Sequence, residues 1–166
     1  MVDKSFKVLD TNHTSFTVSS LDRSVAFFCD GLGFKLESRA PRDPKAAPTV
    51  IGVPGARLEV AHIRTVSGHR LELIEFSGPA ERHSVNVRVC DPGSSHMAFD
   101  VDDIFAVIEV AKQHGFTPLS PKPVAHRTGG ANAGALIQYL RHSDGFFIEF
   151  IQRDGLKDRK EGDYLC

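Results

Sequence analysis

The sequence lacks the features that mark several large classes of protein. No apolar run approaches the ~20 residues that a membrane-spanning helix needs, and the N-terminus has no signal-peptide pattern. The formal net charge is only −1, so nothing favours nucleic acid or an anionic membrane as a partner. The three cysteines, Cys29, Cys90 and Cys166, have no metal-type spacing, which favours reduced thiols. We therefore expect a cytoplasmic protein with no nucleic-acid and no membrane partner.

The composition is that of an ordinary globular domain. The chain has 166 residues, of which 41% are hydrophobic and 25% are charged, as is typical of such domains. This length fits one domain of ordinary size, or two small modules that share a core.

One stretch of the sequence occurs twice. Residues 13–21, HTSFTVSSL, correspond to residues 96–104, HMAFDVDDI, at an offset of 83 (96 − 13). Apolar residues alternate with polar or small ones in both copies, which predicts a half-buried strand that begins at the histidine. A helical pattern follows each strand, and it ends in Gly-Phe at 33–34 and again at 115–116. An internal repeat therefore organises the chain.

The ends of the two copies correspond as well. Residues 71–74, LELI, align with residues 148–151, IEFI, at an offset of 77 (149 − 72). Each copy is thus predicted to be a strand, a helix and three further strands. The expected units are a single domain over 1–152, with module one at about 9–76, a linker at 77–94 and module two at about 95–152, followed by a charged C-terminal tail at 153–166.

Four polar residues fall where strand alternation predicts inward-facing positions: His13, Glu72, His96 and Glu149. A lone carboxylate among Ile, Leu and Phe side chains is costly to bury unless a cation accompanies it. Two imidazoles and two carboxylates suit a borderline or hard divalent ion. A single His or Glu in a strand is usually a surface residue, so the recurrence of the pair in both copies carries this hypothesis. Glu75 faces the other way, and we expect it to point to solvent.

The remaining histidines have no partner in the opposite copy, and the surface or a loop is expected for each. They are His62, His69, His83, His114, His126 and His142. His126 and Arg127 precede a glycine-rich segment, 128–134, and are candidates for substrate contact. That segment lacks the strand-to-helix context of a phosphate-binding loop. A Pro-rich polar segment, 40–48, predicts an exposed loop near the opening of a site.

The repeated stretches resemble the vicinal oxygen chelate superfamily, which includes glyoxalase I, methylmalonyl-CoA epimerase, extradiol dioxygenases and fosfomycin- or bleomycin-resistance proteins. The matching segments are NHTSFTVSSLDRSVAFFCDGLGF, RLELIEF, SSHMAFDVDDI and SDGFFIEFIQ, which together span most of residues 11–152. The resemblance implies an α+β fold in which two tandem βαβββ modules form a curved mixed-sheet cup. It also implies one divalent metal ion (Co, Ni, Mn, Zn or Fe) with the ligands His13, Glu72, His96 and Glu149.

A Glu at the end of both modules is more similar to the glyoxalase and epimerase branch than to the extradiol dioxygenases. The implied activity is that of an isomerase, epimerase or lyase on a small carbonyl or acyl substrate. Proton abstraction next to a metal-polarised carbonyl would use Glu149 or Glu72 as the base. Two alternatives stay open: an extradiol-type iron-dependent dioxygenase on the same scaffold, and a non-catalytic module that binds a small molecule such as a drug. Sheet edges and apolar helix faces left open by such a cup favour a homodimer.

Overall fold

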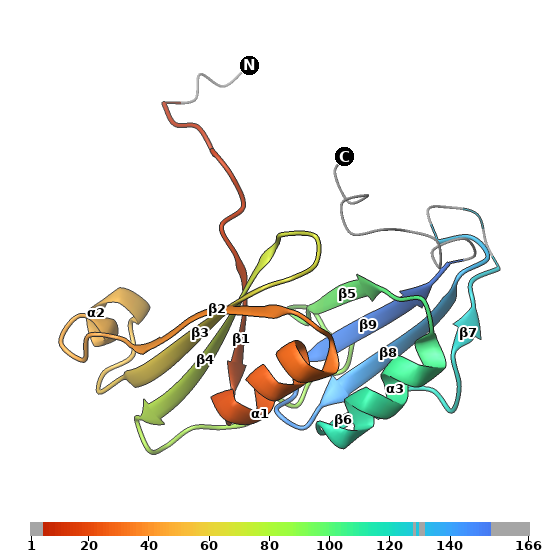
Figure 1. Ribbon diagram of the computed structural model, residues 1–166. Coiled ribbons are helices and arrows are strands. Elements are labelled where there is room, and N and C mark those ends of the chain that lie inside the picture. The colour runs from red at the N-terminus through yellow and green to blue at the C-terminus, as the bar shows by residue number, and fades with distance from the viewer. Residues whose placement is uncertain (1–4, 128, 130–131, 154–166) are drawn as a thin grey trace.

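The computed structural model describes residues 5–127, 129 and 132–153. Within them, two mixed sheets lie side by side (Figure 1), with strand orders β1-β4-β3-β2 and β5-β9-β8-β6, and β7 is added on β8. The first strand of each sheet is parallel to the last strand of its module, and the other pairings are antiparallel. The predicted α+β class with two βαβββ modules is therefore confirmed.

The elements follow the predicted order, with α2 in module one and β7 in module two as additions. Module one contains β1 (Thr14–Val18), α1 (Leu21–Ala26), a π-helical turn η1 (Phe27–Gly31), β2 (Lys35–Pro41), α2 (Ala47–Ile51), β3 (Arg57–Arg64) and β4 (Arg70–Gly78). Module two contains β5 (His96–Asp100), α3 (Ile104–Gln113), β6 (Phe116–Pro118), β7 (Val124–Ala125), β8 (Leu136–His142) and β9 (Phe147–Gln152). The tail from 154 onward lies outside the described residues.

The two modules share one strand register. Thr14 lies opposite Leu71 in module one, and Met97 lies opposite Ile148 in module two. These pairs are related by the same offsets as the sequence repeat, 83 (97 − 14) and 77 (148 − 71). Because a shift of one residue would turn every side chain to the opposite face, the conserved register keeps equivalent residues on equivalent faces.

The start of the first helix of each module, α1 or α3, is held by the last strand of that module. The backbone N–H of Leu21 donates to Glu75 Oε2 at 2.6 Å, and that of Ile104 donates to Gln152 Oε1 at 2.8 Å. Glu75 and Gln152 are related by the offset of 77 (152 − 75). These acceptors satisfy one of the N–H groups that a helix leaves unpaired at its first turn. The prediction that Glu75 points to solvent is therefore wrong, because its carboxylate caps α1.

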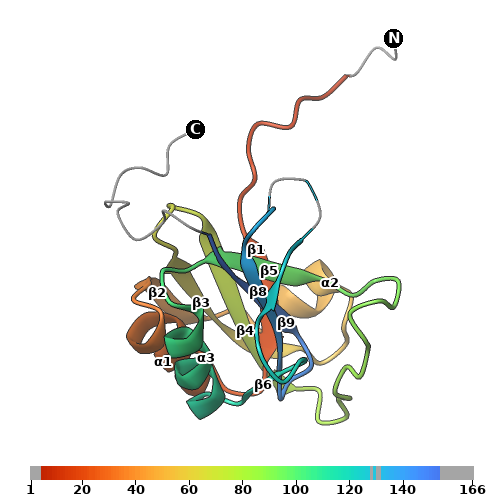
Figure 2. The ribbon, with the colours of Figure 1, turned by 90° about the vertical axis from the view of Figure 1, so that its right-hand side faces the viewer.

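A shared core joins the modules. The helices α1 and α3 lie on the same side of the sheets, and α2 lies on the other side (Figure 2). Strand alternation places Leu71 and Leu73 of β4, and Ile148 and Phe150 of β9, in this core, where each is 0% exposed. The residues between them, including Glu72 and Glu149, consequently face away from the helices. No described helix is long and apolar enough to cross a membrane.

Candidate metal and substrate site

Glu72 is the centre of the polar cluster on module one. Its side chain is 13% exposed and lies on the face of β4 opposite the helices. The Nε2 atom of His13 lies 3.4 Å from Glu72 Oε2, and the Nε2 atom of His62 lies 3.1 Å from Oε1. The Arg42 guanidinium approaches the same Oε1 to 3.6 Å. Three nitrogen-bearing side chains therefore surround one carboxylate.

Glu149 has the corresponding place on module two. Its side chain is 9% exposed, and its Oε2 atom lies 3.2 Å from His96 Nε2. The hydroxyl of Tyr139 lies 3.3 Å from the same His96 nitrogen. Burial, and then the neighbouring Glu149 carboxylate, raise the pKa of the Tyr139 phenol. The phenol is thus a neutral hydrogen-bonding group at physiological pH.

The structure brings the four sequence candidates together as two pairs. His13 contacts Glu72 on one sheet, and His96 contacts Glu149 on the other. Among residues 5–127, 129 and 132–153, no group of three or more His, Cys, Asp or Glu side chains is arranged to hold a metal ion. The donor chemistry nevertheless suits a divalent ion, because each half offers one imidazole nitrogen and one carboxylate. Their role as ligands stays a prediction.

Sequence reasoning missed three residues of these clusters: Arg42, His62 and Tyr139. His62 lies directly opposite Glu72 in the β3–β4 pairing, and Tyr139 lies opposite Glu149 in the β8–β9 pairing. They are counterparts at the offset of 77 (139 − 62). The offset of 77 relates the two positions in the sequence. The correspondence is hard to recognise there because the residue types differ, a His in one module and a Tyr in the other.

An apolar floor adjoins the cluster of module one. Leu58 and Val60 of β3 share the His62 face of their strand, and Ile74 and Phe76 of β4 share the Glu72 face. They pack in one cluster with Ala47 at the start of α2. The polar cluster is thus bordered by a small buried core, of which Ile74 and Phe76 are the partly exposed members.

The other histidines have varied surroundings. His142 was expected at the surface but is buried in β8, where its ring stacks on Phe146 at 4.6 Å and contacts Phe116 at 4.7 Å. His69 lies 3.0 Å from Thr14 Oγ1. The backbone N–H of His126 donates to the Ala135 carbonyl at 2.8 Å, at the base of the glycine-rich segment. Residues 128, 130 and 131 of that segment are outside the described part, and substrate contact by His126 and Arg127 stays a prediction.

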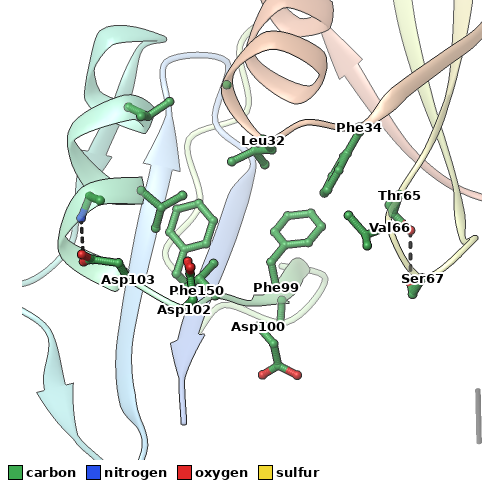
Figure 3. Close-up of a pocket in the computed structure, with 16 residues that line it drawn as sticks. Leu32, Phe34, Thr65, Val66, Ser67, Phe99, Asp100, Asp102, Asp103 and Phe150 are labelled. Atoms are coloured by element: carbon green, nitrogen blue, oxygen red, sulfur yellow. Dashed lines mark hydrogen bonds between the residues drawn. The ribbon is translucent and has the colours of Figure 1, made fainter. Parts of the chain in front are cut away.

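A separate cavity of about 630 Å³ lies between the modules. Phe99 stands between Phe34 and Phe150 in its lining, to which Val66 and Asp102 also belong (Figure 3). None of the four candidate ligands lines it. The cavity is therefore a feature of the packing between the modules and is distinct from the two polar clusters.

These observations define a class of protein: paired βαβββ modules, each with a His–Glu contact on the face away from its helix. The family model of the Glyoxalase/Bleomycin resistance protein/Dioxygenase superfamily matches residues 11–150. The chain therefore belongs to this superfamily, which confirms the resemblance seen in the sequence.

Individual relatives include named enzymes. The chain is 28% identical over 148 residues to a lactoylglutathione lyase of Haemophilus influenzae, covering 87% of this chain and 93% of that protein. It is 29% identical over 147 residues to a 2-epi-5-epi-valiolone epimerase of Actinomyces sp, covering 84% of this chain and 77% of that protein. A solved glyoxalase family protein from Bacillus cereus matches with a TM-score of 0.74 at 25% identity, covering 91% and 98% of the two chains. Relatives named as lyase and epimerase support an enzyme of this superfamily.

Proposed function

We propose that this chain is a divalent-metal-dependent isomerase, epimerase or lyase that removes a proton from a carbon next to a carbonyl group. The observation that carries the proposal is the duplicated imidazole–carboxylate contact, 3.4 Å in module one and 3.2 Å in module two. The relatives named lactoylglutathione lyase and epimerase support the same class of reaction.

The positions of the residues support the following roles. His13, Glu72, His96 and Glu149 would hold the ion, which supplies polarisation of a substrate carbonyl oxygen when bound. Glu149 accepts the proton from the neighbouring carbon as a general base, with Glu72 as the other carboxylate in reach of the site. Return of the proton to the opposite face gives an epimer, and return to the adjacent carbon gives an isomer of the glyoxalase type. The partly exposed Ile74 and Phe76, on the Glu72 face of β4, would contact the aliphatic part of the substrate.

We further propose that the site is completed by a second copy of the chain. The two His–Glu pairs lie on separate sheets of one chain, and β1 and β5 each pair with only one described strand. Such open edges invite pairing between copies. In a homodimer with twofold symmetry, module one of one protomer would face module two of its partner.

The test begins with metal content. The purified protein should hold about one divalent ion per chain, measured by elemental analysis after loading with Co, Ni, Mn, Zn or Fe. The loaded protein should then incorporate solvent deuterium into one of a panel of acyl-CoA thioesters, 2-oxo compounds and lactoylglutathione, followed by NMR. Metal binding without exchange into any of them would count against the proposed reaction.

A second candidate is an iron-dependent oxygenase, and one observation favours it. His13 contacts Glu72 Oε2 and His62 contacts Glu72 Oε1, so module one has two imidazoles beside one carboxylate. That is the donor set of non-haem iron oxygenases. Oxygen consumption by the Fe(II)-loaded protein with catechols would identify this activity, whereas proton exchange without oxygen uptake would exclude it for the substrate tested.

A further inference from the structure

The residue opposite each carboxylate differs between the modules. On β3 it is His62, and on β8 it is Tyr139. The two positions correspond, because the register of the neighbouring strands is the same in both modules. Glu72 and Glu149 therefore differ in the side chain that faces each of them from the neighbouring strand.

Glu72 is held by one of its two oxygens. His62 Nε2, at 3.1 Å, and Arg42 Nη2, at 3.6 Å, both approach Oε1, whereas His13 approaches Oε2. The other nitrogen of the His62 ring, Nδ1, lies 3.0 Å from Ser38 Oγ on β2. The imidazole is thus fixed at both ends, and it fixes the carboxylate in turn. Glu72 Oε2 is therefore the oxygen that faces His13, the other candidate ligand of module one.

Glu149 has fewer restraints. His96 is its single ion-pair partner among the described residues, and it is itself a candidate ligand. Tyr139 has its hydroxyl 3.3 Å from His96 Nε2. If His96 binds a metal ion, the neutral phenol of Tyr139 is the side chain of β8 that remains beside Glu149. In module one, the imidazole of His62 and the guanidinium of Arg42 lie beside Glu72.

We propose that His62, supported by Arg42, is a positioning residue that fixes Glu72 as a permanent ligand, so that Glu149 is the carboxylate free to move and act as the base. The inference rests on the proposed function. Outer hydrogen bonds orient metal-binding carboxylates and contribute to affinity. A carboxylate held by two donors from outside the ligand set loses less freedom on binding than one held by a phenol. The two roles therefore depend on one pair of equivalent residues. His62 makes Glu72 the permanent ligand, and Tyr139 leaves Glu149 free to act as the base.

Cobalt alone is a suitable probe, since Co(II) bound by nitrogen and oxygen donors absorbs visible light. We expect His62→Leu to weaken Co(II) binding by ~10-fold or more, the usual scale for loss of an outer hydrogen bond to a ligand. His62→Gln, which keeps an N–H donor for Oε1, should recover most of the affinity. Tyr139→Phe should change the affinity by less than about threefold, well below that scale. His69→Leu is the matched control, because His69 precedes β4 but contacts Thr14 and not a carboxylate.

The outcomes separate this inference from the proposed function. Equal losses in His62→Leu and Tyr139→Phe, or no loss in His62→Leu, would overturn the inference and leave the function standing. A loss in His62→Gln as large as in His62→Leu would also overturn it, because His62 would then be a ligand itself. Absence of Co(II) binding by the unaltered protein would instead remove the proposed function, and the inference with it. Circular dichroism and thermal unfolding of each variant show whether it is folded, and His62→Gln keeps the test valid if the Leu variant is not.

Discussion

The two modules have the same framework and different chemistry on it. In each, a side chain of the last strand caps the first helix, and a His on the first strand contacts a Glu on the last. They differ at the third strand, where His62 of one corresponds to Tyr139 of the other. Module one also has α2 between its second and third strands, and its apolar floor packs against α2. The comparison shows that the helix caps and the His–Glu contacts are duplicated, whereas the residues that face the carboxylates from β3 and β8 have diverged.

The packing between the modules shows a second difference. Phe16 of β1 stacks on Phe146 at 4.4 Å, and the Ser19 N–H donates to Asp144 at 2.8 Å, so the turn before β9 is closed against module one. The counterpart of Phe16 is Phe99 (99 − 16 = 83), and near Phe99 the turn before β4 leaves the cavity of Figure 3 open. His69 stands where module two has Phe146 (146 − 69 = 77). Phe99 packs instead against Phe34 and Phe150 in the wall of the cavity.

The largest expected effect concerns the two carboxylates. Glu149→Gln should stay folded while proton exchange at the substrate carbon falls by ~10²-fold or more, the usual scale of general-base loss. Gln keeps the shape and an oxygen donor but cannot accept the proton. Solvent-deuterium incorporation measured by NMR provides the rate, and Glu75→Gln is the control because its role is confined to the α1 cap. Equal exchange in the unaltered protein and Glu149→Gln, with metal bound in both, would assign the base to Glu72.

The next effect is on metal binding. His96→Ala should lower the affinity for a divalent ion by ~10-fold or more through loss of a ligand, and His13→Ala should do the same because it is the equivalent residue of the other half. Isothermal titration with Zn(II) or Co(II) measures both. Full metal occupancy in the His13→Ala, His96→Ala double variant would contradict the proposed site.

Much of this comparison was predictable from the sequence, for a physical reason. Alternation and the two offsets locate the strands and the faces of Glu72 and Glu149, because a period of two is a local property of the chain. The role of Glu75 was not predictable, since it depends on β4 lying beside the start of α1. The segment 40–48 was expected to be a loop, but its last two residues begin α2, for which Pro48 in the first turn and Gly52, with φ of 69°, at the end are ordinary helix boundaries. At five residues it is too short for its periodicity to stand out.

A smaller effect tests the duplicated helix caps. Glu75→Ala removes the acceptor for the Leu21 N–H and should lower the free energy of unfolding by about 1 kcal/mol, the usual scale for a lost cap. Glu75→Gln should be nearly neutral, because Gln152 performs the same function for Ile104. Urea unfolding followed by circular dichroism measures both variants. A loss in Glu75→Gln equal to that in Glu75→Ala would show that module one requires the charge and not merely the acceptor.

The smallest expected effect is a pH dependence that belongs to module two. Burial lowers the pKa of His142 from its ordinary value of 6.5, and its Nδ1 accepts the Asp144 N–H at 3.1 Å, which requires an unprotonated nitrogen. The unfolded chain therefore binds this proton at a higher pH than the folded chain does. The resulting stability is fully present above pH 6.5 and is lost as the pH falls from there through the lower folded pKa. Urea unfolding measures this between pH 7.5 and pH 5, a range chosen about the ordinary pKa of histidine. The free energy of unfolding should fall less steeply with falling pH in His142→Phe than in the unaltered protein. A variant of the exposed His83 is the control and should behave as the unaltered protein does. Because the counterpart of His142 is Thr65 (142 − 65 = 77), module one has no titrating group at this place, and identical slopes in all three proteins would remove the asymmetry.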